Sequence, residues 1–161
     1  MSTKTAETTT ERAILSRILT EGYGPGAWHG ADLKAALADV TEATAFTRPA
    51  HGRHSIAEIA IHHAYCTRSV RERLSGKTPE PFVLDGDDWF ALPDATKLTW
   101  KQLAKAVETE QRKLADVVSG LAEGKASPLS SDEQLNLVLG ITCHAVYHAG
   151  QVQLVKKLVG R

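Results

Sequence analysis

Cysteine, aromatic residues, net charge and long apolar runs are all scarce in this chain of 161 residues. Two cysteines are too few for a disulfide framework, which indicates a reducing compartment. A formal net charge of +0 argues against the basic surface of a nucleic-acid-binding protein. No stretch approaches the roughly 20 apolar residues of a membrane span, and the opening MSTKTAETTT lacks the apolar core of a secretory signal. We therefore expect a cytoplasmic protein that binds neither nucleic acid nor membrane.

The length of the chain suits one domain with a complete hydrophobic core, and 42% hydrophobic residues are ordinary for a globular protein. The first ten residues are polar and rich in threonine, so we expect residues 1–10 to be a disordered tail. We expect residues 11–161 to fold as a single helical domain, because strand-like alternation of apolar and polar residues never continues for more than a few positions.

Four segments have apolar residues at helical spacing, and they extend over residues 8–40, 55–74, 95–121 and 131–159. Capping patterns open three of them, namely Thr8 with Glu11, Ser55 with Glu58, and Ser131 with Gln134. Glycines and a proline between residues 22 and 30 interrupt the first segment, and Gly76 ends the second. These patterns predict an all-α four-helix bundle with an interrupted first helix, and its long connections allow crossovers.

The last segment carries polar side chains in the middle of its predicted buried stripe. Steps of four and three residues pass through Leu137, Ile141, His144, His148, Gln151, Val155 and Leu158. Residues four apart share a helix face with Cβ atoms about 5–6 Å apart, so His144 and His148 could chelate one metal ion. A histidine on an apolar face is more often a core residue satisfied by hydrogen bonds. Three buried polar side chains in succession are nevertheless costly without partners, and a shared cation would remove much of that cost.

A third ligand has to come from another helix, and the spacing leaves two candidates on the second. His63 lies in register with Ile59 and Cys66, in the apolar stripe of that helix. His62 lies about a hundred degrees further round the helix. The spacing alone slightly favours His63 as the partner of the pair on the last helix.

Residues 55–62 (SIAEIAIH), followed downstream by residues 147–151 (YHAGQ), resemble the DinB-like (damage-inducible) metal-binding bundles. Residues 27–30 (AWHG) and 87–90 (DDWF) are similar to segments of one branch of that family. The resemblance covers most of the chain from about residue 12. It implies a DinB-like four-helix bundle that holds a metal ion through one histidine of the second helix and the His-x-x-x-His pair of the last.

Matched residue by residue, the resemblance implies that His62, His144 and His148 are the metal ligands. The family usually has an aliphatic residue where this chain has His63, and tryptophan where it has Cys66. We therefore expect His63→Ala and Cys66→Ser to retain metal. Three neutral imidazoles that leave a coordination position open are typical of a catalytic metal site, and zinc or nickel suits them best.

Three further residues are candidates for supporting roles. Gln151 could orient a ligand, Glu110 could be a fourth ligand or a base, and His29 could approach from the glycine-rich break. The chain has no nucleophile elbow, phosphate-binding loop or dinucleotide-binding motif, so no other catalytic residue is assigned.

The resemblance also implies a function, because the better-known relatives transfer low-molecular-weight thiols or isomerise small acids through thiol adducts. We expect a metal-dependent enzyme acting on a small molecule, thiol transferase-like or hydrolase-like, with a low-molecular-weight thiol as its partner. The alternatives are a non-catalytic metal-binding stress-response module and a helical interaction domain. We also expect a homodimer, from the resemblance and because the broken first helix leaves apolar surface uncovered.

Overall fold

The computed structural model describes residues 14–92 and 98–160, and all regular secondary structure in these ranges is helical. The predicted cap at Thr8 and Glu11 lies outside the described residues. A first helix covers residues 14–23 and is followed by α2 (Leu33–Leu37), α3 (Glu42–Phe46), α4 (Ile56–Ser75), α5 (Trp100–Ala122) and α6 (Ser131–Val159). The predicted all-α class is confirmed.

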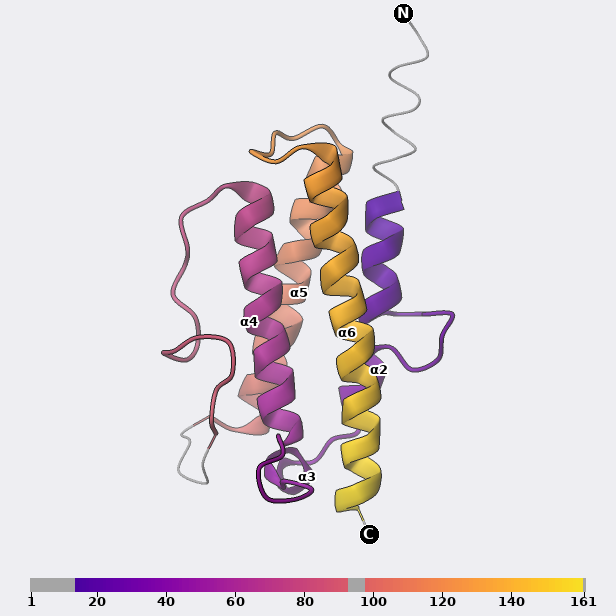
Figure 1. The fold of residues 1–161 in the computed structure, drawn as a ribbon, viewed down its shortest axis with the longest axis vertical. Helices are drawn as coiled ribbons and strands as arrows, with labels where there is room; N and C mark the ends of the chain where they lie inside the picture. Colours follow the sequence, from indigo (N-terminus) through magenta and orange to yellow (C-terminus); the bar gives the residue numbers. More distant parts are fainter. Residues whose placement is uncertain (1–13, 93–97, 161) are drawn as a thin grey trace, which may run out of the picture.

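The long helices form a bundle in which α4 and α5 run in one direction and α6 in the other (Figure 1). The first helix lies beside one half of α6 and α2 beside the other half, so these two pieces together take the place of one interrupted helix. The connection between α4 and α5 returns along the outside of the bundle to the end where α4 began. The predicted crossover and the interrupted first helix are therefore both present.

Glycine allows both the close approach of the first helix and the break after it. A Cβ atom at Gly22 would lie 2.8 Å from the carbonyl oxygen of Thr142, so the first helix contacts α6 at this point without a side chain between them. Gly24 has φ +94°, and a Cβ there would collide with the carboxylate of Asp32. That carboxylate accepts a hydrogen bond of 2.9 Å from the backbone N–H of Ala35 and so caps α2.

The ends of α4 lie where they were predicted, whereas the observed caps of α5 and α6 are not the predicted ones. Ser55 and Glu58 form the predicted capping box, and Gly76 ends α4 with φ 65°. The start predicted for α5, near Ala95, lies outside the described residues; within them, Thr99 has an extended backbone and caps a helix that begins at Trp100. The predicted cap of α6 was one residue late, since Ser130 and Glu133 satisfy the same pattern and form the capping box.

The buried stripe of α6 is rotated from the predicted one. Its buried members are Val138, Ile141, Thr142, Ala145, His148, Ala149, Val152 and Val155. His144 is only half-buried, and Leu158 is 50% exposed. The physical reason is the close packing on this side of α6, where the first helix approaches at Gly22 beside the small side chain of Ala145 and α2 also contacts α6.

Glu58 fixes the start of α4 from inside the protein. Its side chain is fully buried and accepts hydrogen bonds from the backbone N–H of Ser55 (2.8 Å) and of Leu92 (3.1 Å). The guanidinium of Arg48 also pairs with this carboxylate. One side chain therefore joins the chain before α4 to the end of the long connection after it.

Candidate metal centre

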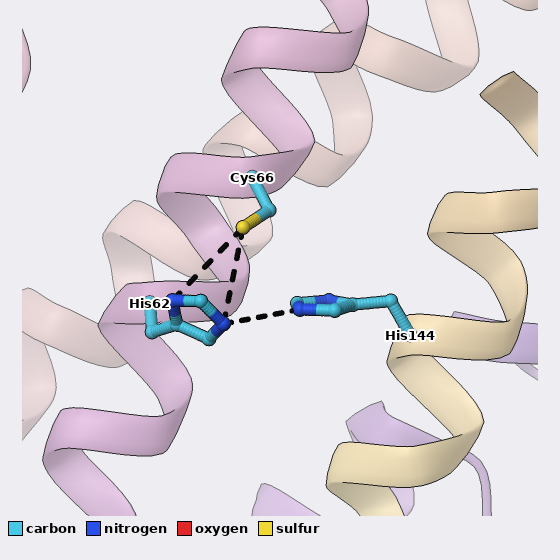
Figure 2. Close-up of side chains that lie close together, drawn as sticks. All are labelled: His62, Cys66 and His144. Carbon is cyan, nitrogen blue, oxygen red and sulfur yellow. Dashed lines mark hydrogen bonds between the residues drawn. The ribbon is translucent and has the colours of Figure 1, made fainter. Parts of the chain in front are cut away.

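The middle of α4 faces the middle of α6 through a cluster of imidazoles. His62 Nε2 lies 3.1 Å from His144 Nε2, and His148 Nε2 lies 3.0 Å from the same atom. In Figure 2 the rings of His62 and His144 point at each other from the two helices. The structure thus brings together the three residues that the resemblance had matched.

Cys66 belongs to the same cluster. Its sulfur lies 3.9 Å from His62 Nε2, one helical turn along α4 (Figure 2). Single ligand atoms of His62, Cys66 and His144 all lie within 4.8 Å of one another, and this group could hold a metal ion. Burial and the charge of Asp88 raise the pKa of the Cys66 thiol to about 11.

The outer nitrogens of two imidazoles are held by acceptors. His62 Nδ1 donates to the backbone carbonyl oxygen of Asp88 (2.9 Å), and His148 Nδ1 donates to Gln151 Oε1 (2.6 Å). Because a neutral imidazole carries one proton, each ring in its neutral form has this proton on Nδ1 and a lone pair on Nε2. The role foreseen for Gln151, orienting a ligand, agrees with this contact.

The third imidazole is oriented through His63. The hydroxyl of Thr67 donates to the backbone oxygen of His63 (2.8 Å), so its oxygen is free to accept from His63 Nε2 (3.2 Å). His63 Nδ1 then has a lone pair and accepts a hydrogen bond from His144 Nδ1, at 3.0 Å. The proton of His144 is therefore also on Nδ1, and its lone pair is on Nε2.

The Nε2 atoms of His62 and His148 therefore lie 3.1 and 3.0 Å from His144 Nε2, and with these tautomers neither contact contains a proton. Such a group of acceptors is costly unless a cation lies among them. Protonation of His144 or His148 is disfavoured, because burial and the neighbouring imidazoles lower the pKa of His144 to about 4, and burial with nearby histidines lowers that of His148 to about 4. Neutral imidazoles with converging lone pairs are the donor set that a divalent transition metal requires.

The connection after α4 covers one side of the cluster. Trp89 stacks on the ring of His62, with centroids 3.9 Å apart, and on the ring of His54 at 3.8 Å. Asp88 has φ 60°, the left-handed conformation that turns its carbonyl toward His62. These contacts of Trp89 and Asp88 with the site were not predicted. The signal available in the sequence was the similarity of residues 87–90 (DDWF) to a segment of one branch of the family.

Two other candidates take different partners. Glu110 accepts from Arg71 Nε at 3.2 Å and from Lys113 Nζ at 3.4 Å, in an ion-pair group between α4 and α5. His29 is exposed, and its Nε2 bonds the backbone oxygen of Glu21 at 3.0 Å. Neither residue therefore contacts the histidine cluster through these bonds, and the roles considered for them at the metal find no support in this arrangement.

Comparison with known families gives one match. The family model described as the DinB superfamily matches residues 27–152, which include α2 to α5, most of α6 and all the histidines of the cluster. No curated protein and no solved structure matches the chain. Among the described residues, no helix is both long and apolar enough to cross a membrane.

Proposed function

Because the chain belongs to the DinB superfamily, we propose that it is a metal-dependent enzyme acting on a small molecule, with the ion held by His62, His144 and His148. The observation that carries this proposal is that the Nε2 atoms of His62 and His148 lie 3.1 and 3.0 Å from His144 Nε2. Imidazole ligands of this kind suit zinc or nickel. Three protein ligands leave a position for a thiol or a water molecule.

The residues around the histidines have separable tasks in this proposal. Asp88, Gln151 and His63 each bond the Nδ1 atom of a different ligand, so each Nε2 keeps its lone pair and its direction. Trp89 lies against His62 and keeps water from that face of the ring. A bound divalent metal lowers the pKa of a coordinated thiol or water, which supplies a nucleophile at neutral pH. A thiol transferase-like or hydrolase-like reaction on a small substrate uses this chemistry.

One observation favours a second candidate function. The sulfur of Cys66 lies close enough to His62 Nε2, at 3.9 Å, to become a fourth ligand. Four protein ligands would close the site, as in structural zinc centres, and the protein would then be a non-catalytic metal-binding module. Cys66→Ala distinguishes the two functions, because it opens a closed site but leaves the coordination of an open site unchanged.

We expect the purified protein to contain about one divalent metal ion per chain, consistent with one three-imidazole site. With a low-molecular-weight thiol and an electrophilic substrate, metal-loaded protein should form thioether product, while metal-stripped protein should not. Elemental analysis and product detection by mass spectrometry measure the two quantities. Stoichiometric metal without thiol transfer or ester hydrolysis in wild-type and Cys66→Ala protein would refute the enzyme and retain the binding module.

The His63 and Thr67 contacts make a further prediction about affinity. In Thr67→Val, His63 Nε2 loses its acceptor, so the proton of His63 is no longer held away from His144. We expect metal affinity to fall about 10-fold, the lower end of the effect of residues that orient a ligand. His63→Leu should have an effect of similar size, and both variants should still bind one ion at saturating metal.

Chelator-competition titration measures this affinity, and the visible spectrum of the cobalt-substituted protein reports the ligand geometry. Thr67→Ser keeps the hydroxyl and is the matched control, with affinity unchanged. If Thr67→Val and Thr67→Ser bind equally well, the hydroxyl does not orient the site.

A further inference from the structure

A groove runs along the seam between α5 and the two pieces of the broken helix, the first helix and α2. α5 packs mainly on α4, and α2 packs mainly on α6. The seam between them contains two hollows with volumes of about 490 and 560 Å³, which share Tyr23, Lys34 and Glu108 as lining residues. The hollows therefore adjoin, and each has the size of a typical small-molecule site, about 300–1,000 Å³.

The groove is separate from the histidine cluster. The cluster lies between α4 and α6, and none of its residues lines either hollow. Figure 1 shows the first helix and α2 on the side of α6 that faces away from α4. A ligand in the groove would therefore occupy a second site, which does not depend on the proposed function of the metal centre.

The first hollow has an apolar floor. Leu37 and Trp100 line it and are each only 8% exposed, while Tyr23 and Ala104 are half-buried beside them. Aromatic and aliphatic side chains of this kind cover the apolar body of a ligand. The first hollow thus suits a hydrocarbon or an aromatic ring.

Positive charge predominates around the groove, although the whole chain has a formal net charge of +0. Its lining residues include two carboxylates, Glu108 and Asp116, and four cations, Lys34, Lys101, Lys105 and Arg112. Lys105 pairs with Glu108 at 2.6 Å. Among the described residues, no ion pair involves Lys34 or Lys101, so both ammonium groups are available to an anion.

Two uncharged donors also line the groove. Gln111 is 7% exposed in the second hollow, and the hydrogen bonds among the described residues include none from its side-chain amide. A buried amide without a partner is costly, and an acceptor on a ligand would remove that cost. Burial and the nearby charges of Glu108 and Asp32 raise the pKa of Tyr23 to about 12, so its hydroxyl stays protonated and can donate.

We propose that the groove binds a small amphipathic carboxylate. Its apolar body lies on Leu37 and Trp100 in the first hollow, and its carboxylate lies in the shared part of the groove, at Lys34. Gln111, which lines the second hollow together with Lys34, supplies a further donor. A carboxylate forms a charge-assisted hydrogen bond with an ammonium group, which a cationic head group cannot form.

Isothermal titration calorimetry on the full chain tests this proposal with two probes of equal chain length, decanoate and decyltrimethylammonium. One decanoate should bind per chain, and decyltrimethylammonium should bind at least about 10-fold more weakly because it lacks the charge-assisted bond. Absence of saturable decanoate binding would overturn the proposal. Equal affinity for the two probes would also overturn it, because the groove would then recognise only the hydrocarbon.

Two variants locate the ligand in the groove. Lys34→Glu reverses the charge at the proposed carboxylate position and should weaken decanoate binding about 10-fold or more. Lys77→Glu is the matched control, because Lys77 is an exposed lysine outside the groove, and affinity should be unchanged. Ala104→Trp fills the first hollow and should abolish binding with unchanged helical circular dichroism. Wild-type affinity in Lys34→Glu or in Ala104→Trp would contradict the assignment.

Two further measurements exclude other occupants and other sites. His144→Ala should bind decanoate as the wild-type protein does, and loss of binding in this variant would place the carboxylate at the metal centre instead. Light scattering reports whether a second copy covers the groove. A dimer that does not bind decanoate and that Ala104→Trp dissociates would overturn the proposal. Because decanoate binding is measured without reference to metal, its failure can be distinguished from failure of the proposed function.

Discussion

His62→Ala, His144→Ala and His148→Ala should each lose most of the bound metal after identical purification. Each substitution removes one of three imidazoles, of which His62 and His148 place their Nε2 atoms 3.1 and 3.0 Å from His144 Nε2. The remaining two imidazoles cannot complete a site, so affinity should fall by more than the roughly 10–100-fold that orienting residues contribute. Metal content per chain, measured by elemental analysis, is the readout.

His63→Ala and Cys66→Ser are the controls for these three variants, and both should retain metal at saturation. His63 contacts the cluster through the outer nitrogen of His144, and Cys66 leaves all three imidazoles in place when replaced. The assignment of ligands fails if His63→Ala empties the site while His62→Ala does not. Loss of metal in Cys66→Ser would make the sulfur a ligand.

Glu58→Ala should lower the free energy of unfolding by about 2–6 kcal/mol, because two buried backbone donors lose their acceptor at roughly 1–3 kcal/mol each. The substitution leaves the backbone N–H groups of Ser55 and Leu92 without their acceptor inside the protein. Arg48 also loses its carboxylate but is partly exposed, so it can be solvated and contributes less.

The chain offers a matched control for this effect. Glu133 occupies the same position in the capping box of α6, where it accepts a 2.8 Å hydrogen bond from the backbone N–H of Ser130, but it is exposed. Glu133→Ala should cost only about 0.5–1 kcal/mol, as for an ordinary capping interaction. Urea unfolding followed by circular dichroism compares the two, and equal losses would show that burial of Glu58 adds nothing.

The bundle could be predicted because its signals are local. The capping box at Ser55, the stop at Gly76 and the break between residues 22 and 30 each depend on a few neighbouring residues, and each occurs as predicted. The position of the buried stripe of α6, which is rotated from the predicted one, could not be predicted from local signals. It depends on the approach of the first helix beside Ala145 and on the contact of α2 with α6, and these contacts join distant parts of the sequence.

The candidate site could be predicted only in part from the sequence, for the same reason. The pair His144 and His148 follows from helical spacing, whereas His62 rested on the resemblance. The bond of His62 to Asp88 has no periodic signal, because it joins a helix to an irregular connection. The sequence argument chose between His62 and His63 as the ligand from α4. The cluster contains both residues, because His63 contacts His144.

The separation of the cluster's two halves in the sequence has a consequence for biosynthesis. His62 and His144 are 82 residues apart, and α6, which carries His144, follows the other described helices in the sequence. A nascent chain on the ribosome exposes α4 long before it completes α6, so the imidazoles of α4 lack their partners on α6 until that helix has been synthesised. At ordinary elongation rates of about 5–20 residues per second, this interval lasts several seconds. Truncation of the chain before α6 should therefore yield a product that cannot assemble the cluster, however well α4 and α5 form.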